Sequence, residues 1–433
     1  MTTWAADTAS QLTETFSGAF EGDGIVVAVG AIDDEHVVLH DPPDSAEDSR
    51  FEIGSLTKPI TATLAAVLAE EGQLSWTDPI GKWLDAGPNE GITVEQLATH
   101  TSGLPRLAPN AFGKGVDQNN PYAHYSAELA EKGLREARLA PDEERGYSNF
   151  GFQLLGLIVE RAGGLSYEKF LRTRFLEPLS MRCSGVRGSG MEGTELPGHT
   201  DGRAVPHWDQ QLPGPGGVEA TMADLLKFLQ ACLAPPAGDL GRAIAASQQP
   251  RVATGQRQQG LGWTILEGGY VWHNGGTGGF TSSAVFDPAK KRAVAVMVNS
   301  GGGELDAAVM RAIKGEDPRS ARPQPPGPEW EARGRELATA LLEGRFEDVY
   351  AAMDEEFRAK VTLKQLSAIW KLGTLRAGKP GDIEVTCRRR PGSVAAEVTI
   401  ARTRKPTRLA VAWRDDGAIA GFTILKGDKP SPF

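Results

Sequence analysis

The sequence predicts an α+β protein, in which an antiparallel sheet is flanked by helices, followed by a smaller α+β domain. Three observations carry this prediction. Strand-like runs lie near both ends of the first part, at residues 24–30, 283–286 and 293–298, and helical stretches fill the middle. A proline-rich segment then interrupts the chain. A helix and several alternating strands come after it, which is the order of a second, smaller layered domain.

The length and the proline-rich segment set the predicted domain boundaries. At 433 residues the chain exceeds the usual size of one domain, so we expect one large domain and a smaller appendage. Residues 317–328 are too rich in proline for a helix or a strand and are typical of a semi-rigid linker. We therefore predict a large domain over residues 1–316 and a C-terminal domain over 329–433.

Composition and charge exclude several classes of partner. Hydrophobic residues make up 40% of the chain and charged residues 24%, which is typical of a packed globular protein. With 46 basic and 56 acidic residues the net charge is -10, which repels phosphate backbones, so nucleic acid is not an expected partner. No apolar run reaches transmembrane length and the first residues lack the pattern of a secretory signal. We expect a cytoplasmic protein without membrane association.

A serine and a lysine three positions apart form the first candidate motif. Ser55 and Lys58 stand where an apolar strand gives way to an amphipathic helix that ends near Gly72. Side chains at this spacing share one helix face, so Lys58 is expected beside the Ser55 hydroxyl. A serine is a weak nucleophile unless a base takes its proton, and a lysine kept neutral by burial or by nearby positive charge can do so. Alone, such a pair is also typical of an ordinary surface helix.

Tyr147 and Asn149 form the second motif, directly before another predicted helix. A tyrosine whose pKa is lowered by a nearby ammonium can move a proton between a nucleophile and a leaving group. Asn149 can hydrogen-bond Lys58 or a substrate carbonyl. The alternative interpretation of these residues is a packed tyrosine in a loop that starts a helix.

The third motif is the glycine-rich segment 273–280, between two strand-like runs. We predict an edge strand there, against which an acyl substrate lies, because glycines permit close backbone approach. The N–H groups of Gly276 and Ser55 would form an oxyanion hole, a contact that commonly supplies a large part of catalysis. The alternative is a flexible glycine turn.

The order, contexts and spacing of the three motifs resemble the serine β-lactamase and penicillin-binding-protein superfamily, whose boxes are Ser-x-x-Lys, Tyr-x-Asn or Ser-x-Asn, and Lys-Thr-Gly. The likeness is specific to the class C β-lactamase-like branch, which contains esterases, D-aminopeptidases and transacylases. Segments 51–54, 97–105 and 216–224 agree with it, and it covers roughly residues 10–315. The resemblance implies a sheet domain with an all-helical region inserted and the site between them. The residues expected to contact substrate are Asn149, Asn274, Gly275 and Thr277.

One departure from the family pattern affects the expected substrate. His273 stands where a β-lactamase has lysine, and Asn274 replaces its threonine or serine. Histidine is mostly neutral at pH 7, so this site should anchor the carboxylate of a penicillin less well, and we do not expect β-lactams as substrates. Histidine in this box resembles the esterase and peptidase members. His273 is expected to orient Tyr147 or the substrate, while Lys58 and Tyr147 move protons and either can be the base.

Three functions compete. The leading hypothesis is a serine hydrolase that forms an acyl-Ser55 intermediate and hydrolyses a small ester or amide. The second is a transacylase of natural-product assembly, in which an amine or alcohol attacks the acyl-serine. The third is a binding protein without turnover, and the intact set of Ser55, Lys58 and Tyr147 argues against it. The motifs imply no metal or organic cofactor, and three scattered cysteines indicate neither a zinc site nor a disulfide framework.

The C-terminal domain resembles, more weakly, the small NTF2-like domains appended to bacterial hydrolases, through segments 344–350 and 363–370. Strands are predicted at 383–387, 396–400 and 409–413, with a hairpin turn at 416–417. Such a domain can bind a ligand, close over a neighbouring site or form a homodimer, and no residue favours one of these. A packing module without chemistry is the alternative.

Overall fold

The computed structural model describes two compact units. The described residues are 3–17, 19–20, 23–34, 36–40, 48–113, 115–117, 119–141, 145–254, 257–321, 327–375, 377–390, 393–414 and 416–425. Contacts within the chain divide it into Met1–Ala321 and Arg322–Phe433. The division falls inside the predicted linker, of which residues 322–326 lie outside the described residues. Among the described residues, no helix has the length and apolar character needed to cross a bilayer.

An eight-stranded antiparallel sheet forms the centre of the first unit, in the order β2-β1-β14-β13-β12-β11-β10-β9. In that order the strands are β2 (Val37–His40), β1 (Val27–Ile32), β14 (Arg292–Val298), β13 (Thr281–Asp287), β12 (Val271–Gly276), β11 (Thr264–Ile265), β10 (Arg257–Gln259) and β9 (Val252–Thr254). The three predicted strand runs lie in β1, β13 and β14, which are neighbours. The predicted antiparallel sheet, built from both ends of the unit, is confirmed.

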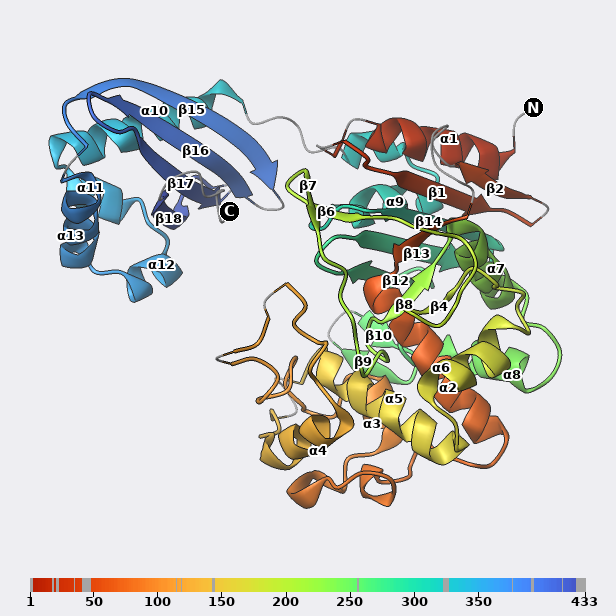
Figure 1. Cartoon of the computed structure of the whole chain (residues 1–433). Helices are drawn as coiled ribbons and strands as arrows, with labels where there is room; N and C mark the ends of the chain where they lie inside the picture. Colours follow the sequence, from red (N-terminus) through yellow and green to blue (C-terminus); the bar gives the residue numbers. More distant parts are fainter. Residues whose placement is uncertain are drawn as a thin grey trace. The chain divides into compact units, whose positions relative to one another are not determined.

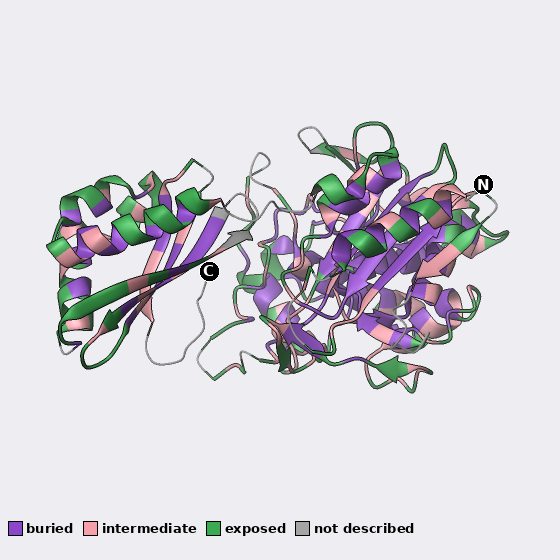
Figure 2. Ribbon diagram, turned by 90° about the horizontal axis from the view of Figure 1, so that it is seen from above, coloured by how far each residue is buried: buried purple, intermediate pink, exposed green. Residues whose placement is uncertain are grey.

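Helices cover both faces of this sheet (Figure 1). On one face, α1 (Trp4–Phe16) and α9 (Asp306–Lys314) share an apolar core with β1, β13 and β14. On the other face, α7 (Met222–Leu233) packs on the sheet, and α2 (Thr57–Glu70) packs against α8 (Asp239–Ser247). The central strands are accordingly buried on both sides, as Figure 2 shows. A short 3-10 helix, η6 (Pro318–Ala321), packs against α1 and α9 where the predicted linker begins.

A helical region is inserted between the first and last strands of the sheet. It consists of α3 (Val94–Ala98), α4 (Ala127–Glu136), α5 (Asn149–Gly163) and α6 (Tyr167–Leu171), with the turns η2 (Ile80–Lys82), η3 (Gly87–Asn89) and η5 (Arg172–Leu176). α2 packs against α5 as well as α8, so it joins the sheet layer to the helical region. This helix is buried along nearly its whole length, which matches its run of alanine, leucine and valine.

A second, small sheet leads the chain into the site. Its order is β4 (Gly185–Val186), β8 (Val218–Ala220), β3 (Ser49–Glu52) and β5 (Thr194–Glu195), and a separate hairpin joins β6 (Gly198–Thr200) to β7 (Arg203–Val205). β3 runs directly into the 3-10 helix η1 (Gly54–Leu56) and then α2. The serine of the first motif therefore sits at a strand-to-helix junction, as its sequence context predicts.

The second unit places helices before a sheet. The helices are α10 (Pro328–Glu343), α11 (Phe346–Ala351), α12 (Glu355–Lys360) and α13 (Leu363–Thr374), and the antiparallel strands, in order, are β15 (Pro380–Arg390), β16 (Ser393–Arg402), β17 (Thr407–Arg414) and β18 (Ile419–Leu425). The predicted helix-then-sheet order is confirmed, and the turn at 416–417 joins β17 to β18. The likeness to NTF2-like domains stays a prediction.

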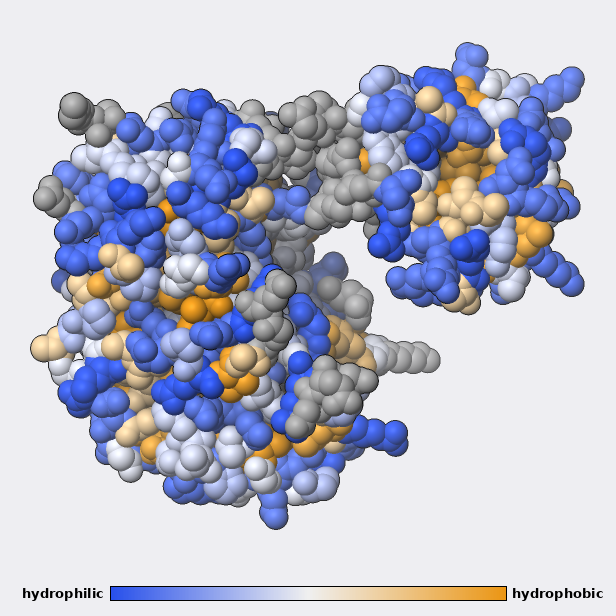
Figure 3. Space-filling model, turned by 180° about the vertical axis from the view of Figure 1, so that it is seen from behind, coloured by the Kyte–Doolittle hydropathy of each residue, from blue (hydrophilic) through white to orange (hydrophobic). Residues whose placement is uncertain are grey.

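One face of the second unit is rich in hydrophobic side chains (Figure 3). A cavity of about 890 Å³ lies between α13 and the β17–β18 pair, and its lining includes Leu372, Leu375 and Ile424. Leu372 and Leu375 are each 75% exposed, which is unusual for leucine in a folded domain.

Candidate active site

Ser55 and Lys58 meet at the start of α2. Nζ of Lys58 lies 2.8 Å from Oγ of Ser55 and donates a hydrogen bond of 2.7 Å to the carbonyl oxygen of Pro215. The Lys58 side chain is fully buried although it carries an amine. A neutral amine that donates a hydrogen to Pro215 still has a lone pair that can accept from the Ser55 hydroxyl, so this geometry suits a base acting on Ser55.

Burial lowers the pKa of Lys58 well below its ordinary value, and the nearby charge of Arg106 lowers it further. Both causes act in the same direction because each penalises the protonated ammonium. The neutral amine is therefore populated at a lower pH than in an exposed lysine. Arg106 supplies the nearby positive charge that a basic lysine was expected to need.

Tyr147 stands beside this pair, just before α5. The helix is capped by Ser148, whose Oγ accepts from the N–H of Gly151 and donates to the carbonyl of Pro105. Nζ of Lys58 lies 4.7 Å from the centre of the Tyr147 ring, and the phenol hydrogen-bonds Ser55. The three predicted residues of the first two motifs thus meet around the Ser55 hydroxyl.

The expected lowering of the Tyr147 pKa is wrong. Burial raises the pKa of Tyr147 to about 12, although the hydrogen bond with Ser55 and the charge of Arg106 oppose the rise. The expectation assumed a lysine ammonium beside the phenol, whereas burial favours the neutral amine of Lys58. Tyr147 is therefore a protonated phenol across the neutral pH range, a proton donor before it is an acceptor.

His273 faces the site from β12. His273 pairs with Ala284 of β13, and its ring centre lies 6.1 Å from that of Tyr147. The charge of Lys58 acts on the imidazole, so His273 faces the side of the sheet where Lys58 lies. Burial, followed by the charge of Lys58, lowers the pKa of His273 to about 3, and the hydrogen bond with the Asn274 carbonyl only partly offsets this. The imidazole is neutral at pH 7, so this strand presents no fixed positive charge to a substrate.

The glycines of β12 bring the strand against the serine turn. β11 pairs only with Val271 and Trp272, so the later residues of β12 have no strand partner on that side among the described residues. A Cβ on Gly54, whose φ is +53°, would lie 2.5 Å from the amide nitrogen of Gly276. A side chain on Gly275 would collide with the Ile53 carbonyl. The close approach brings the Gly276 N–H against the residue before Ser55. The oxyanion hole formed by Ser55 and Gly276 stays a prediction that this packing permits.

Asn274 was expected to contact substrate, and the structure does not bring its side chain to Ser55. Successive residues of a strand point to opposite faces, so Asn274 faces away from the side of His273. Its amide donates a hydrogen bond of 2.7 Å to Asp306, at the start of α9 on the far face of the sheet. Ser283 donates to the same carboxylate, also at 2.7 Å. Asn274 therefore fastens β12 to α9. A substrate contact at the Gly275 main chain stays a prediction.

Asn149 and Thr277, the other two predicted contact residues, each hold a buried oxygen with no hydrogen-bond partner among the described residues. These are Oδ1 of Asn149 and Oγ1 of Thr277. Buried polar atoms usually have partners, so both oxygens are available to a group that enters the site. Their substrate-binding role stays a prediction that the geometry permits.

Two contributors to the site, Arg106 and Pro215, were not singled out by the sequence, and His100 of the 97–105 segment lies beside them. Arg106 holds its guanidinium carbon 5.1 Å from the Tyr147 ring centre, and Pro215 supplies the carbonyl for Lys58. His100, with φ of 61°, accepts from the Ser148 N–H at 3.1 Å and packs 4.4 Å from the Tyr147 ring. Arg106 directly follows the 97–105 segment of the family pattern, which was the available signal. No sequence pattern could have indicated the Pro215 carbonyl, because every residue has a main-chain carbonyl.

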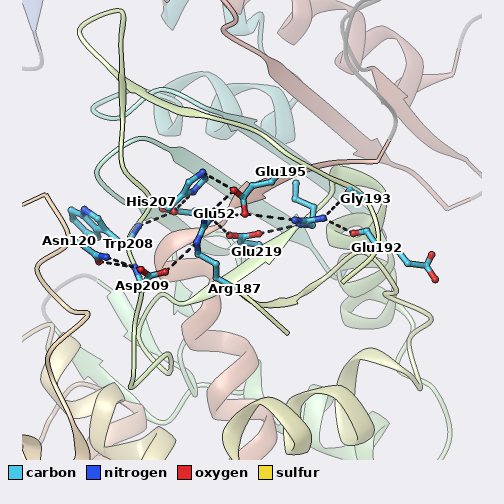
Figure 4. A network of polar contacts seen from close by, with 11 residues as sticks. Glu52, Asn120, Arg187, Glu192, Gly193, Glu195, His207, Trp208, Asp209 and Glu219 are labelled. Atoms are coloured by element: carbon cyan, nitrogen blue, oxygen red, sulfur yellow. Dashed lines mark hydrogen bonds and ion pairs between the residues drawn. The ribbon is translucent and has the colours of Figure 1, made fainter. Parts of the chain in front are cut away.

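A charged network lies beside the site, around the strand that leads to Ser55 (Figure 4). Glu52, His207 and Glu219 come within metal-binding distance of one another. The carboxylate of Glu219, however, already lies 3.3 Å from the guanidinium groups of both Arg50 and Arg187. Two arginines neutralise the cluster, so its chemistry is that of a salt-bridge network rather than a cation site.

Comparisons with known proteins agree with this geometry. The family model described as Beta-lactamase matches residues 12–316. Penicillin-binding protein 4* of Bacillus subtilis (strain 168) is 26% identical over 261 residues, which cover 55% of this chain and 58% of that protein. The D-alanyl-D-alanine-carboxypeptidase/endopeptidase AmpH of Escherichia coli (strain K12) is 28% identical, over 58% of this chain and 71% of its own length.

A solved class C beta-lactamase has the same fold over most of the first unit. The TM-score is 0.62 at 20% sequence identity, and the match covers 74% of this chain and 97% of that one. The Beta-lactamase of Escherichia coli (strain K12) is 26% identical over 58% of this chain and 76% of its own length. The chain thus spans about three fifths of the length of penicillin-binding protein 4* and a larger share of the other relatives.

Proposed function

The chain belongs to the beta-lactamase family, and from that premise we propose that it is a serine hydrolase acting on a small ester or amide. The observation that carries the proposal is the 2.8 Å contact between Ser55 Oγ and a buried Lys58 amine whose pKa is lowered. A binding protein has no use for a lysine buried at such cost beside a serine. The names of the relatives, which include a carboxypeptidase, support acyl transfer through serine.

Acylation uses the three residues in distinct roles. Lys58 Nζ takes the proton of Ser55, and Oγ bonds to the carbonyl carbon of the substrate. The amides of Ser55 and Gly276 hold the oxyanion. Tyr147 gives its proton to the leaving oxygen or nitrogen as the bond to carbon breaks, and the Lys58 ammonium returns a proton to Tyr147. The high pKa of Tyr147 and the low pKa of Lys58 support this division, which the sequence left open.

Deacylation repeats the cycle with water as the nucleophile. Lys58 takes a proton from the incoming water, whose oxygen bonds to the acyl carbon. The Lys58 ammonium then returns that proton to Ser55 Oγ as the bond from Oγ to the acyl carbon breaks and the acid is released. An amine or alcohol in place of water gives an amide or a new ester, which is the transacylase alternative.

Release of p-nitrophenol from a short p-nitrophenyl ester, with and without added amines, tests the proposal. A hydrolase gives a Ser55-dependent rate that amines do not change, and the product is the free acid. Faster release with an amide as product would replace the proposal with a transacylase. No release from any ester by the folded protein would leave the binding protein as the better account.

The acid limb of the pH profile should report Lys58. The base must be neutral, so kcat/KM is expected to rise with pH through the lowered pKa of Lys58 and to level off well below the ordinary lysine value. Tyr147 should stay protonated until its pKa of about 12. Rates measured with a neutral ester across the stable pH range check this. An acid limb that rises only near the ordinary lysine pKa would contradict the assignment.

Restoring the missing charge should change the substrate preference. His273→Lys places an ammonium where the imidazole is neutral, and acylation by a penicillin-like acid is expected to rise about tenfold, the usual scale of one charge-assisted contact. The measurement is the rate of covalent labelling by a fluorescent penicillin, compared with His273→Gln. Equal labelling of both variants and the wild type would show that the missing charge at position 273 is no reason to exclude β-lactams as substrates.

A further inference from the structure

Arg106 carries a charge at the site that nothing in the described protein neutralises. Its guanidinium lies 5.1 Å from the ring centre of Tyr147, and the side chain is exposed. Within the described ranges it makes no ion pair with a carboxylate. Arg50 and Arg187, in the neighbouring network, each face glutamates instead.

An aromatic surface runs on from Arg106. The Arg106 guanidinium lies beside the ring of Tyr147. Burial raises the pKa of Tyr122, and the charge of Arg106 lowers that pKa by less. The ring of Tyr122 lies 5.4 Å from that of Trp208 and 5.8 Å from that of Phe112. A side chain on Gly278 would strike the Trp208 indole, so this surface reaches the segment that follows β12. Arg106, Tyr122 and Trp208 therefore form one wall, from Tyr147 to the glycine-rich strand.

The charged network of Figure 4 fastens this wall to the strand before Ser55. The backbone N–H of Trp208 donates to Glu52 at 3.2 Å, and His207 lies 2.8 Å from the same carboxylate. Asp209 and Asn120 exchange two hydrogen bonds, of 2.8 and 2.9 Å, which tie the Trp208 segment to the loop that carries Tyr122. A wall held by so many polar contacts is pre-organised, and pre-organised groups bind a ligand at lower entropic cost.

Among the basic side chains near Ser55, Arg106 is the one suited to bind an anionic substrate group. His273 is neutral at pH 7 and Lys58 is a buried amine with a lowered pKa, so neither offers a lasting positive charge to a substrate. Arginine stays protonated at every working pH and presents a planar fork that matches a carboxylate. The fixed cation of this site thus stands on the loop between α3 and α4 and not on the strand, where relatives with a lysine box carry theirs.

We propose that Arg106 binds a carboxylate of the substrate, and that the preferred substrates are esters or amides that carry a carboxylate beside an apolar group, which packs on Tyr122 and Trp208. This inference rests on the proposed hydrolase function, because it assigns the substrate class of the same site. It also assigns a function to the exposed Arg106 guanidinium beside Tyr147. The carboxylate can belong to the acyl group or to the leaving group, and the test separates the two.

The test compares charged and neutral esters in wild type, Arg106→Gln and Arg106→Lys. The esters are p-nitrophenyl valerate, the half-ester p-nitrophenyl glutarate, and acetate esters of 4-nitrophenol with and without a ring carboxylate. Arg106→Gln is expected to lower kcat/KM for at least one charged ester about tenfold more than for its neutral partner, and Arg106→Lys to restore part of it. Because Arg106 also affects the Lys58 pKa, the ratio of charged to neutral ester is the quantity read. Arg292→Gln is the matched control: Arg292 also lies over a ring, 4.4 Å from that of Trp4 on the far face of the sheet.

A binding measurement keeps this inference separate from the hydrolase proposal. Calorimetry of Ser55→Ala with p-nitrophenyl glutarate needs no turnover, and Arg106→Gln added to Ser55→Ala should weaken binding about tenfold. That loss of binding would support the charge recognition even if no ester were hydrolysed by the wild type. Two results would overturn it: Arg106→Gln lowers kcat/KM for charged and neutral esters by the same factor, or it leaves the binding of both p-nitrophenyl glutarate and the ring-carboxylate acetate ester unchanged.

Discussion

Ser55→Ala is expected to lower kcat/KM for a p-nitrophenyl ester by at least about 10⁴-fold, the scale on which removing a serine nucleophile abolishes covalent catalysis. Ser55 Oγ lies 2.8 Å from Lys58 Nζ, so Ser55 is the hydroxyl placed to lose its proton to this amine. Steady-state rates of p-nitrophenol release, measured against the uncatalysed reaction, give the comparison. A variant that kept a tenth of the wild-type rate would show that the acyl group never passes through Ser55.

The fold should survive this change. Only one oxygen atom is lost, and Lys58 keeps its hydrogen bond to the Pro215 carbonyl. The melting temperature of Ser55→Ala is therefore expected to stay within a few degrees of the wild type, which circular dichroism can check. Ser320→Ala is the matched control, since its hydroxyl bonds the Asp317 carbonyl in η6, and it should retain full activity.

Lys58→Met is expected to lower kcat/KM by about 10²- to 10⁴-fold, the usual contribution of a general base. Methionine keeps most of the buried volume, so it separates the loss of the base from the cavity that Lys58→Ala would leave, a change that costs roughly 2–5 kcal/mol in a packed interior. The measurement is the single-turnover acylation rate at neutral pH. Acylation above a tenth of the wild-type rate would give the role of base to Tyr147 or to water.

Lys58→Arg adds a second comparison at the same position. The guanidinium stays protonated, so it cannot accept the Ser55 proton, although it supplies a positive charge and hydrogen-bond donors. We expect its acylation rate to be as low as that of Lys58→Met. Recovery of activity in the arginine variant would mean that charge, and not proton transfer, is what Lys58 contributes.

Much of the fold could be predicted from apolar runs and helical spacing in the sequence. The strand runs at 24–30, 283–286 and 293–298 became β1, β13 and β14, because apolar β-branched residues pack best inside a sheet. The Ser55–Lys58 contact followed from helical spacing alone. In the second unit, alternation predicted the strands, although β15 and β16 extend further than the alternating runs at 383–387 and 396–400.

The errors at the site have physical causes. His273 and Asn274 are adjacent in a strand, and successive side chains of a strand point to opposite faces, so only one of the two could face the substrate. This alternation could have excluded the Asn274 side chain from the sequence alone. The pKa of Tyr147 depends on how deeply the phenol is buried, which no local pattern reveals. Arg106 reaches Tyr147 from a loop 41 positions earlier in the chain, a pairing that only the folded structure brings about.

The central claim is that acyl groups pass through Ser55, and covalent capture tests it most directly. The wild-type protein and Ser55→Ala would be treated with a fluorophosphonate and, separately, quenched in acid during turnover of a p-nitrophenyl ester, then measured as intact proteins by mass spectrometry. The account predicts one adduct per wild-type chain, located at Ser55 by peptide mapping, and none on Ser55→Ala. An adduct on another residue, or turnover by a protein that never carries one, would contradict it.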